Sequence, residues 1–242
     1  MLRALKETGI NARLTQSTYE AYKDETSAIA KNWETSLEKE LPSDLRVGIT
    51  KHIPTAVNQK LYSNIVFDHR ACDFEERVDR SDADKEAYKT IAIGGSIPCA
   101  LATVRKYFND TQSSCTPKAQ SNEDLVIEIG KVLVENGYRT PDNGTLWIAL
   151  DKVLEMEYGI VTKIQNSIFE LADSLCSQKP VIALVPASFL HGEGVPTNEC
   201  IIIWNIADGV CTFSTTSSNS NLQMDVNKLL KNIKRAWACS VK

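Results

Sequence analysis

The sequence is poor in histidine and has no closely paired cysteines. Its 242 residues include three histidines, at positions 52, 69 and 191, and seven cysteines without a CxxC pair. An odd number of scattered cysteines supports neither a disulfide framework nor a zinc site. We therefore expect reduced thiols, most of them small buried side chains, and no bound metal.

Long apolar runs are also missing. The longest, "PVIALVPA" and "CIIIWNIA", have the length of strands and fall far short of the ~18 residues of a membrane span. The first residues, "MLRALKETGINARL", lack the continuous apolar segment and the cleavage site of a secretory signal. These absences predict a soluble, cytoplasmic protein with no membrane partner.

No charge of one sign gathers into a patch that would suit nucleic acid. The formal net charge is −4, from 31 acidic and 27 basic residues that are largely interspersed. A nucleic-acid-binding domain usually shows a basic stripe, so we expect no nucleic-acid partner. The sequence also lacks GxGxxG, phosphate-loop and HExxH motifs, and we therefore expect no cofactor.

The chain is long enough for one sizeable core, or for one core with a small appendage. The stretch 73–86, "DFEERVDRSDADKE", is almost wholly charged and indicates a linker or an exposed helix. We take it as the end of a mostly helical N-terminal extension, residues 1–87, that precedes a main domain at 88–242. Within the extension, the patterns predict helices over 16–41 and 54–67 and a short strand over 45–50.

Helices come first in the main domain and strands come late. Apolar spacing predicts helices over 98–108, 125–133, 146–154, 167–175 and 226–233, and β-branched runs predict strands over 158–165, 180–185, 200–206, 209–215 and 237–242. The strands 200–206 and 209–215 flank "ADG", which suits a tight hairpin, and the last strand is expected at a sheet edge. This order predicts an α+β domain, not alternating βαβ units.

Cys99 stands at the beginning of the helix predicted from residue 98. A helix start lowers the pKa of a cysteine and favours the thiolate, because free amides and partial positive charge lie beside the sulfur. A thiolate is the form that attacks a carbonyl group. Cys99 is therefore a candidate nucleophile, and the alternative is a small buried residue in the first turn of a helix.

Several segments together carry a resemblance to a known family: "PCALATVRKYFND", "NGYRTPDNGTLWIALDKVLEMEYGIVTKI", "SIFELADSLCSQKPVIALV" and "CIIIWNIADGVCTFS". In this order they resemble the papain-like cysteine peptidases, in particular the bacteriocin-processing peptidase family (family 39 of the cysteine class) and its free-standing bacterial relatives. The resemblance covers about residues 88–242. It implies a papain-like fold with a helical half and an antiparallel sheet, and hydrolysis of a peptide or protein substrate with Cys99 as nucleophile.

The chain departs from the family's pattern at three places. The family's oxyanion-stabilising glutamine has no counterpart in "IAIGGSIP", where the backbone amides of Gly94, Gly95 or Cys99 are the candidate donors. The position of the family's histidine holds Glu199 and Cys200. The family's Asp or Asn after the next strand is absent from "TFSTTSS".

His191, in the loop "SFLHGEGVPTNE", is the candidate general base that remains. Three functions stay open on the sequence alone. The chain is a cysteine peptidase that uses Cys99 and His191, a catalytically degenerate module of the same fold that binds a peptide or protein, or an assembly protein that acts through its N-terminal region.

Overall fold

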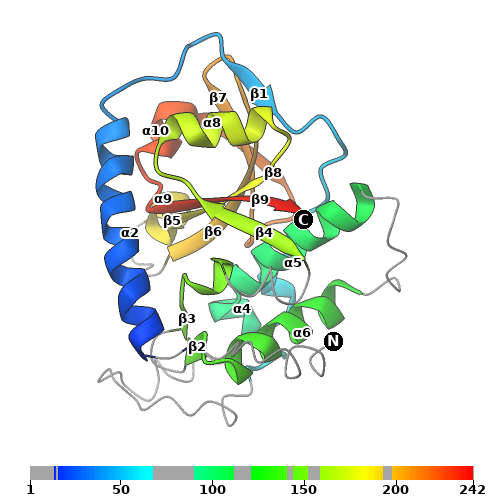
Figure 1. Cartoon of the computed structure of the whole chain (residues 1–242). Helices are drawn as coiled ribbons and strands as arrows, with labels where there is room; N and C mark the ends of the chain where they lie inside the picture. The colour runs from blue at the N-terminus through cyan, green and yellow to red at the C-terminus, as the bar shows by residue number, and fades with distance from the viewer. Residues whose placement is uncertain are drawn as a thin grey trace.

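The computed structural model describes Leu14 and residues 16–67, 90–111, 121–140, 144–151, 159–192 and 198–241. A seven-stranded sheet lies between two groups of helices (Figure 1). The protein is thus of the α+β class, as the sequence predicts. The charged stretch 73–86 lies outside the described residues.

The sheet is antiparallel at every pairing of the described strands. Its order is β4-β9-β5-β6-β7-β8, and β1 pairs with the far end of β6. The strands are β1 (Arg46–Gly48), β4 (Ile160–Ile164), β5 (Val181–Pro186), β6 (Asn198–Ala207), β7 (Val210–Thr215), β8 (Asn221–Asp225) and β9 (Arg235–Val241). A separate two-stranded ladder joins β2 (Arg139–Thr140) and β3 (Gly144–Thr145).

Helices cover both faces of this sheet (Figure 1). One face carries α5 (Ser96–Thr111) and α6 (Asn122–Glu135), and the other carries α8 (Ile168–Cys176) and α10 (Val226–Leu230). The long α2 (Gln16–Ser36) runs along the side of the sheet, while α4 (Ile91–Gly94), α9 (Ala187–His191) and the 3₁₀ turn η1 (Gln59–Leu61) are short. None of the described helices is both long and apolar enough to span a membrane.

The strand β6 separates two apolar cores by simple alternation. Cys200, Ile202 and Trp204 belong to the core on the α5 side, whereas Ile201 and Ile203 belong to the core on the α8 side. The ladder with β7 then shifts register between Ile203 and Asn205, a bulge that brings Ile206 to the α8 side as well.

The predicted hairpin is confirmed. Asp208 and Gly209, between β6 and β7, both have positive φ, at 53° and 76°. Two consecutive residues of this kind form the turn whose twist matches that of the flanking strands.

Two expectations are wrong: the helix over 54–67 and the edge position of the last strand. Residues 54–67 form only η1, because tertiary partners take their backbone groups: the Val57 amide donates to Thr103 Oγ1 at 2.9 Å, and the Gln59 amide donates to the Thr216 carbonyl at 2.8 Å. The C-terminal strand β9 is not an edge strand, since it lies between β4 and β5. Its buried Trp237 and Cys239 fit an interior position.

The described part of the N-terminal extension packs into the same cores as the rest of the chain. Trp33 and Leu41 belong to the core on the α8 side, while Val57 and Tyr62 belong to the core on the α5 side. The strand β1 joins the sheet through β6. These residues are therefore part of one folded unit with the main domain.

Candidate functional site

The site lies where α4 passes into α5, next to the first residues of β6. Gly95 joins the two helices, and a Cβ atom at this position would lie 2.3 Å from the Ile91 carbonyl oxygen. Only glycine fits so close to the preceding turn. The residue that follows, Ser96, is the first residue of α5, so Cys99 stands almost one turn inside the helix.

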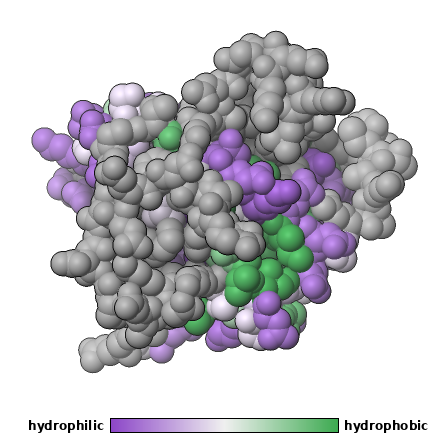
Figure 2. Space-filling model, turned by 90° about the horizontal axis from the view of Figure 1, so that it is seen from below, coloured by the Kyte–Doolittle hydropathy of each residue, from purple (hydrophilic) through white to green (hydrophobic). Residues whose placement is uncertain are grey.

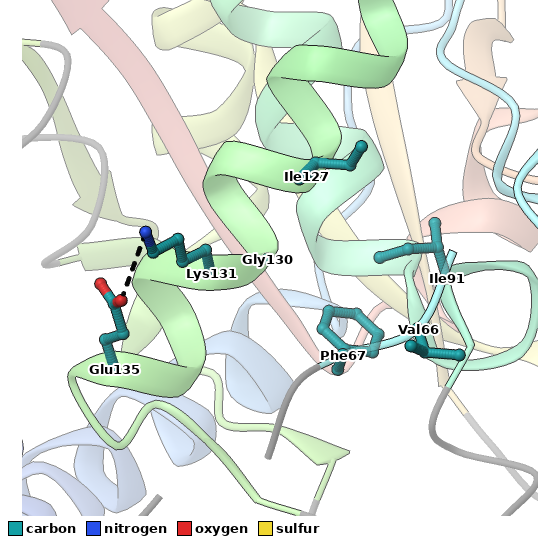
Figure 3. Close-up of a pocket in the computed structure, with 7 residues that line it drawn as sticks. All are labelled: Val66, Phe67, Ile91, Ile127, Gly130, Lys131 and Glu135. Carbon is teal, nitrogen blue, oxygen red and sulfur yellow. Dashed lines mark ion pairs between the residues drawn. The ribbon is translucent and has the colours of Figure 1, made fainter. Parts of the chain in front are cut away.

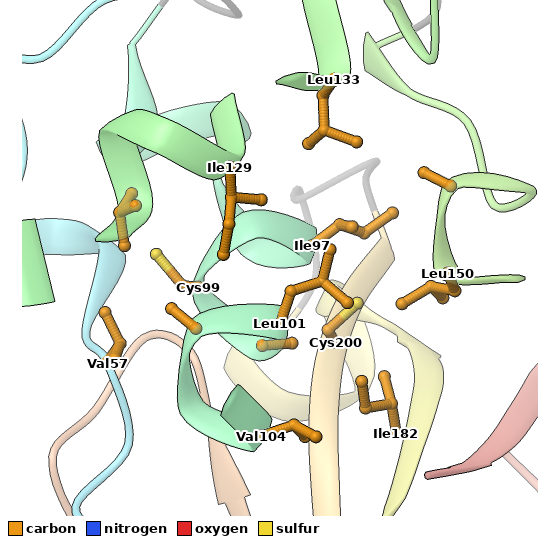
Figure 4. Packing of buried hydrophobic residues seen from close by; sticks show 14 of the residues in the cluster. Val57, Ile97, Cys99, Leu101, Val104, Ile129, Leu133, Leu150, Ile182 and Cys200 are labelled. Carbon is orange, nitrogen blue, oxygen red and sulfur yellow. The ribbon is translucent and has the colours of Figure 1, made fainter. Parts of the chain in front are cut away.

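Cys99 is sealed in the core on the α5 side. Its exposed fraction is 0%, and Figure 4 shows its side chain among buried apolar residues that include Val57 and Ile129. Burial raises the pKa of the Cys99 thiol well above its ordinary value, and the neighbouring Cys200 adds a smaller effect in the same direction. Burial of this kind favours the protonated thiol over the thiolate.

The amides expected to stabilise an oxyanion are already engaged. The amide of Gly94 donates to the Thr90 carbonyl at 2.9 Å, that of Gly95 to the Ile91 carbonyl at 2.8 Å, and that of Cys99 to the Gly95 carbonyl at 2.9 Å. The expectation that they serve as oxyanion donors is therefore wrong. A donor that is already satisfied by the helix cannot also stabilise a developing charge.

Ser96 occupies the position at the helix start that the sequence analysis gave to Cys99. Its Oγ accepts hydrogen bonds from the Cys200 amide at 2.5 Å and from Thr216 Oγ1 at 3.1 Å. Thr216 Oγ1 also lies 3.4 Å from Gln59 Oε1, the alternative acceptor for its single hydroxyl hydrogen. The serine hydroxyl therefore ties α5 to the start of β6 and to the end of β7, and no imidazole bonds it among the described residues.

Cys200 contributes a second buried thiol beside this serine. Burial raises the pKa of the Cys200 thiol to about 12, although the hydrogen bond from Ser96 acts in the opposite direction. Its exposed fraction is 0%. Neither cysteine near the start of α5 is therefore a reactive thiolate at neutral pH.

His191 meets Glu199 and Ser217 instead of Cys99. The His191 Nε2 atom lies 2.5 Å from Glu199 Oε2 and 3.2 Å from Ser217 Oγ, and Ser217 Oγ donates to Glu199 Oε1 at 2.8 Å. No hydrogen bond joins His191 to Cys99 in the part of the chain that the structure describes. The two predicted catalytic residues are not brought together.

This three-residue cluster does not have the arrangement of a catalytic triad. A triad uses one ring nitrogen of histidine for the acid and the other for the nucleophile. Here Glu199 and Ser217 both approach Nε2 of His191. With both partners on one ring nitrogen, Glu199 does not orient the ring so that the other nitrogen faces Ser217.

The sequence analysis missed Ser96, Thr216 and Ser217. The first had a signal, because serine directly before an apolar helical pattern marks a helix start. The other two lie in the polar loop after β7, which carries no motif. Only the pairing of β6 with β7 places that loop beside α5 and α9.

A buried arginine supports the joint from below. Arg139 has an exposed fraction of 0%, and its Nη1 donates to the Gly94 carbonyl at 2.9 Å and to Thr145 Oγ1 at 2.8 Å. Its guanidinium carbon lies 3.4 Å from the centre of the Phe67 ring. A buried charge needs partners of this kind, and the bond to Gly94 makes Arg139 a structural support of the joint between α4 and α5.

An apolar surface lies on the helical side of the molecule. Four large apolar side chains there are exposed: Leu61, Val66, Ile93 and Ile127, at 67%, 62%, 52% and 43%. Figure 2 shows apolar surface gathered on the face seen from below. Exposed apolar groups of this size often mark an interaction surface.

A pocket of 330 Å³ opens beside Val66 and Ile127 (Figure 3). Phe67 and Ile91 form its floor, and a Cβ atom on Gly130 would lie 3.2 Å from the Phe67 ring. Of the side chains drawn in Figure 3, only Lys131 and Glu135 are charged, and they pair with each other at 3.6 Å. The pocket therefore suits an apolar group, not an ion.

Within the described residues, no group of three His, Cys, Asp or Glu side chains is placed to hold a metal ion. The fold and the site define an α+β protein with a sealed thiol near a helix start, a hydrogen-bonded serine at that start, and an exposed apolar face. No protein-family model and no curated protein sequence matches the chain.

Proposed function

We propose that the chain is a papain-like module that binds a peptide or a protein and does not cleave it. The burial of Cys99 carries this proposal. A peptidase of this class needs a thiolate that reaches the substrate, and the exposed fraction of Cys99 is 0%.

The surroundings of the helix start support the same conclusion. Ser96 accepts two hydrogen bonds there, and its neighbour Cys200 is as deeply buried as Cys99. A nucleophile needs a base within hydrogen-bond reach, and His191 is occupied by Glu199. The groups present close the junction between α5 and the sheet, and they do not activate an attacking atom.

The exposed apolar side chains supply the binding part of the proposal. Val66 and Ile127 flank a pocket large enough for an apolar side chain, and Leu61 and Ile93 are also exposed. A partner that covers such groups removes them from water, which favours association. The bound segment is expected to present apolar side chains.

Thiol labelling distinguishes this module from a peptidase. With an iodoacetamide reagent on the folded chain at neutral pH, we expect Cys99 to react at least about a hundredfold more slowly than Cys176, because a buried thiol reacts only after local opening. Cys176 is exposed and has no catalytic role, so it serves as the internal reference. Mass analysis of digested protein reads each site separately.

A peptide-hydrolysis screen completes the test. The expected result is no turnover by the wild-type chain. Turnover that is abolished by Cys99→Ala and preserved by Cys176→Ala would show that the cysteine peptidase hypothesis is right and the binding-module proposal wrong. So would fast labelling of Cys99 in the folded chain.

A further inference from the structure

A second pocket lies between α2 and the beginning of β9, away from the Cys99 site. Its volume is 430 Å³, within the range of about 300–1,000 Å³ that is usual for small-molecule sites. In Figure 1 the helix α2 passes beside the first residues of β9. The side chains that define its character are Tyr19, Tyr22, Lys23, Leu146, Trp147 and Arg235.

The charges on this pocket have one sign. Lys23 and Arg235 are the only charged residues among the described residues that line it. The carboxylates of Glu25 and Asp151, together with Lys163, line a neighbouring pocket of 680 Å³ that shares Tyr22. The pocket between α2 and β9 is therefore the one that suits an anion.

Arg235 is held by two hydrogen bonds and has further N–H donors left over. Its Nη1 donates to the Lys234 carbonyl at 2.7 Å and its Nη2 to the Thr26 carbonyl at 3.2 Å, while its buried Nε has no hydrogen-bond partner. Burial lowers the pKa of Arg235, and the opposing effects of Tyr22 and Glu34 are smaller. A guanidinium in this state gains from an added carboxylate.

Aromatic rings form the walls around these two cations. The Lys23 Nζ lies 4.6 Å from the centre of the Tyr19 ring, and the Arg235 guanidinium carbon lies 5.7 Å from the centre of the Trp147 ring. Tyr19, Tyr22 and Trp147 are all partly exposed, so part of each side chain is left for contact with a ligand. Rings of this kind favour a planar or apolar group.

We propose that this pocket binds a carboxylate that carries an apolar or aromatic group. The carboxylate lies between Lys23 and Arg235, and the apolar group packs against Tyr22 and Trp147. A free small acid and the C-terminal residue of a peptide share this chemistry. Cys99 does not line this pocket, so the carboxylate proposal can be tested separately from the proposed function.

Calorimetric titration of the full chain tests the site with a matched pair of probes. N-acetylphenylalanine carries the carboxylate, and N-acetylphenylalaninamide has the same shape without the charge. We expect the acid to bind at least about tenfold more tightly, because a hydrogen bond between charged groups is lost in the amide.

Two variants locate the binding. Lys23→Gln is expected to weaken binding of the acid about three- to tenfold and to leave binding of the amide unchanged. Lys31→Gln removes an exposed charge from the same helix outside the pocket and is expected to change neither affinity. Arg235→Lys keeps the charge but loses the planar guanidinium with its paired donors. It is expected to weaken binding of the acid more than Lys23→Gln does.

Equal binding of acid and amide, no binding of either in the millimolar range, or equal effects of Lys23→Gln and Lys31→Gln would overturn the proposal. A pentapeptide that ends in a free phenylalanine then identifies the source. Tighter binding than N-acetylphenylalanine supports the site as a receptor for peptide C-termini, and equal binding supports it as a small-acid site.

Discussion

At the scale of single residues, the site depends on Gly95, because the joint between α4 and α5 leaves no space for a Cβ atom there. Gly95 sits against the carbonyl of Ile91, and its φ of −93° is one that any residue adopts. The constraint there is steric and not conformational. It brings Ser96 to the helix start, where its hydroxyl reaches the amide of Cys200.

Gly95→Ala is expected to lower the free energy of unfolding by about 2–4 kcal/mol, because the new methyl group meets backbone that cannot move without disturbing α5. Gly130→Ala is the matched control, since its Cβ meets side chains and not backbone: the ring of Phe67 at 3.2 Å and Ile91 Cδ1 at 3.7 Å. Removing a glycine from a helix interior gains up to about 1 kcal/mol, which offsets that contact. Urea denaturation measures both, and equal losses would contradict the steric explanation.

At the scale of elements, the start of β6 is the meeting point of several segments. Glu199 accepts hydrogen bonds from His191 at the end of α9 and from Ser217 after β7, while Cys200 bonds Ser96 of α5. The side chain of Glu199 is 6% exposed and that of His191 is 35% exposed. A buried acceptor of this kind holds its donors in one arrangement.

A double-mutant cycle of Glu199→Ala and Ser217→Ala tests this role. We expect Glu199→Ala alone to cost about 1–3 kcal/mol of unfolding free energy, since it leaves two donors without their acceptor, and the pair to show a coupling of at least about 0.5 kcal/mol. The exposed pair Arg46 and Asp208 is the control cycle, with side chains 74% and 59% exposed. Its coupling is expected to be at most about 1 kcal/mol. Additive effects at Glu199 and Ser217 would show that the cluster is incidental.

At the scale of the whole molecule, α2 and β9 belong to one folded unit. The helix α2 contributes Trp33 to the core on the α8 side, and the Ser36 hydroxyl accepts a hydrogen bond from the Ile168 amide at 3.1 Å. The Arg235 guanidinium reaches Thr26 from β9. The N-terminal region thus stabilises the sheet and forms one wall of the carboxylate pocket.

Trp33→Ala is expected to cost about 3–5 kcal/mol of unfolding free energy, because this side chain is 3% exposed and its loss leaves a cavity. Lys31→Ala, on the exposed face of α2, is expected to stay within about 0.5 kcal/mol of wild type. Chemical denaturation followed by circular dichroism measures both. Equal small effects would mean that α2 is not part of the core.

Much of the secondary structure was predictable because it depends on neighbours in sequence. The helices α5, α6 and α8, the strands β4 to β7 and the hairpin between β6 and β7 all follow local periodicity or turn residues. The failures have long-range causes. Residues 54–67 do not form the predicted helix, because their backbone amides donate to Thr103 and Thr216. The strand β9 lies between β4 and β5, which are distant from it in sequence.

The candidate site shows the same division. By itself, the sequence determined that Cys99 would stand near the start of a core helix, since apolar spacing sets the buried face of a helix. Only the tertiary structure decided that Ser96 reaches the sheet while Cys99 is sealed, and that His191 turns to Glu199. The reason is geometric: burial and hydrogen-bond partners depend on which distant segments pack together, and the packing of α5 against α6 and β6 sets both.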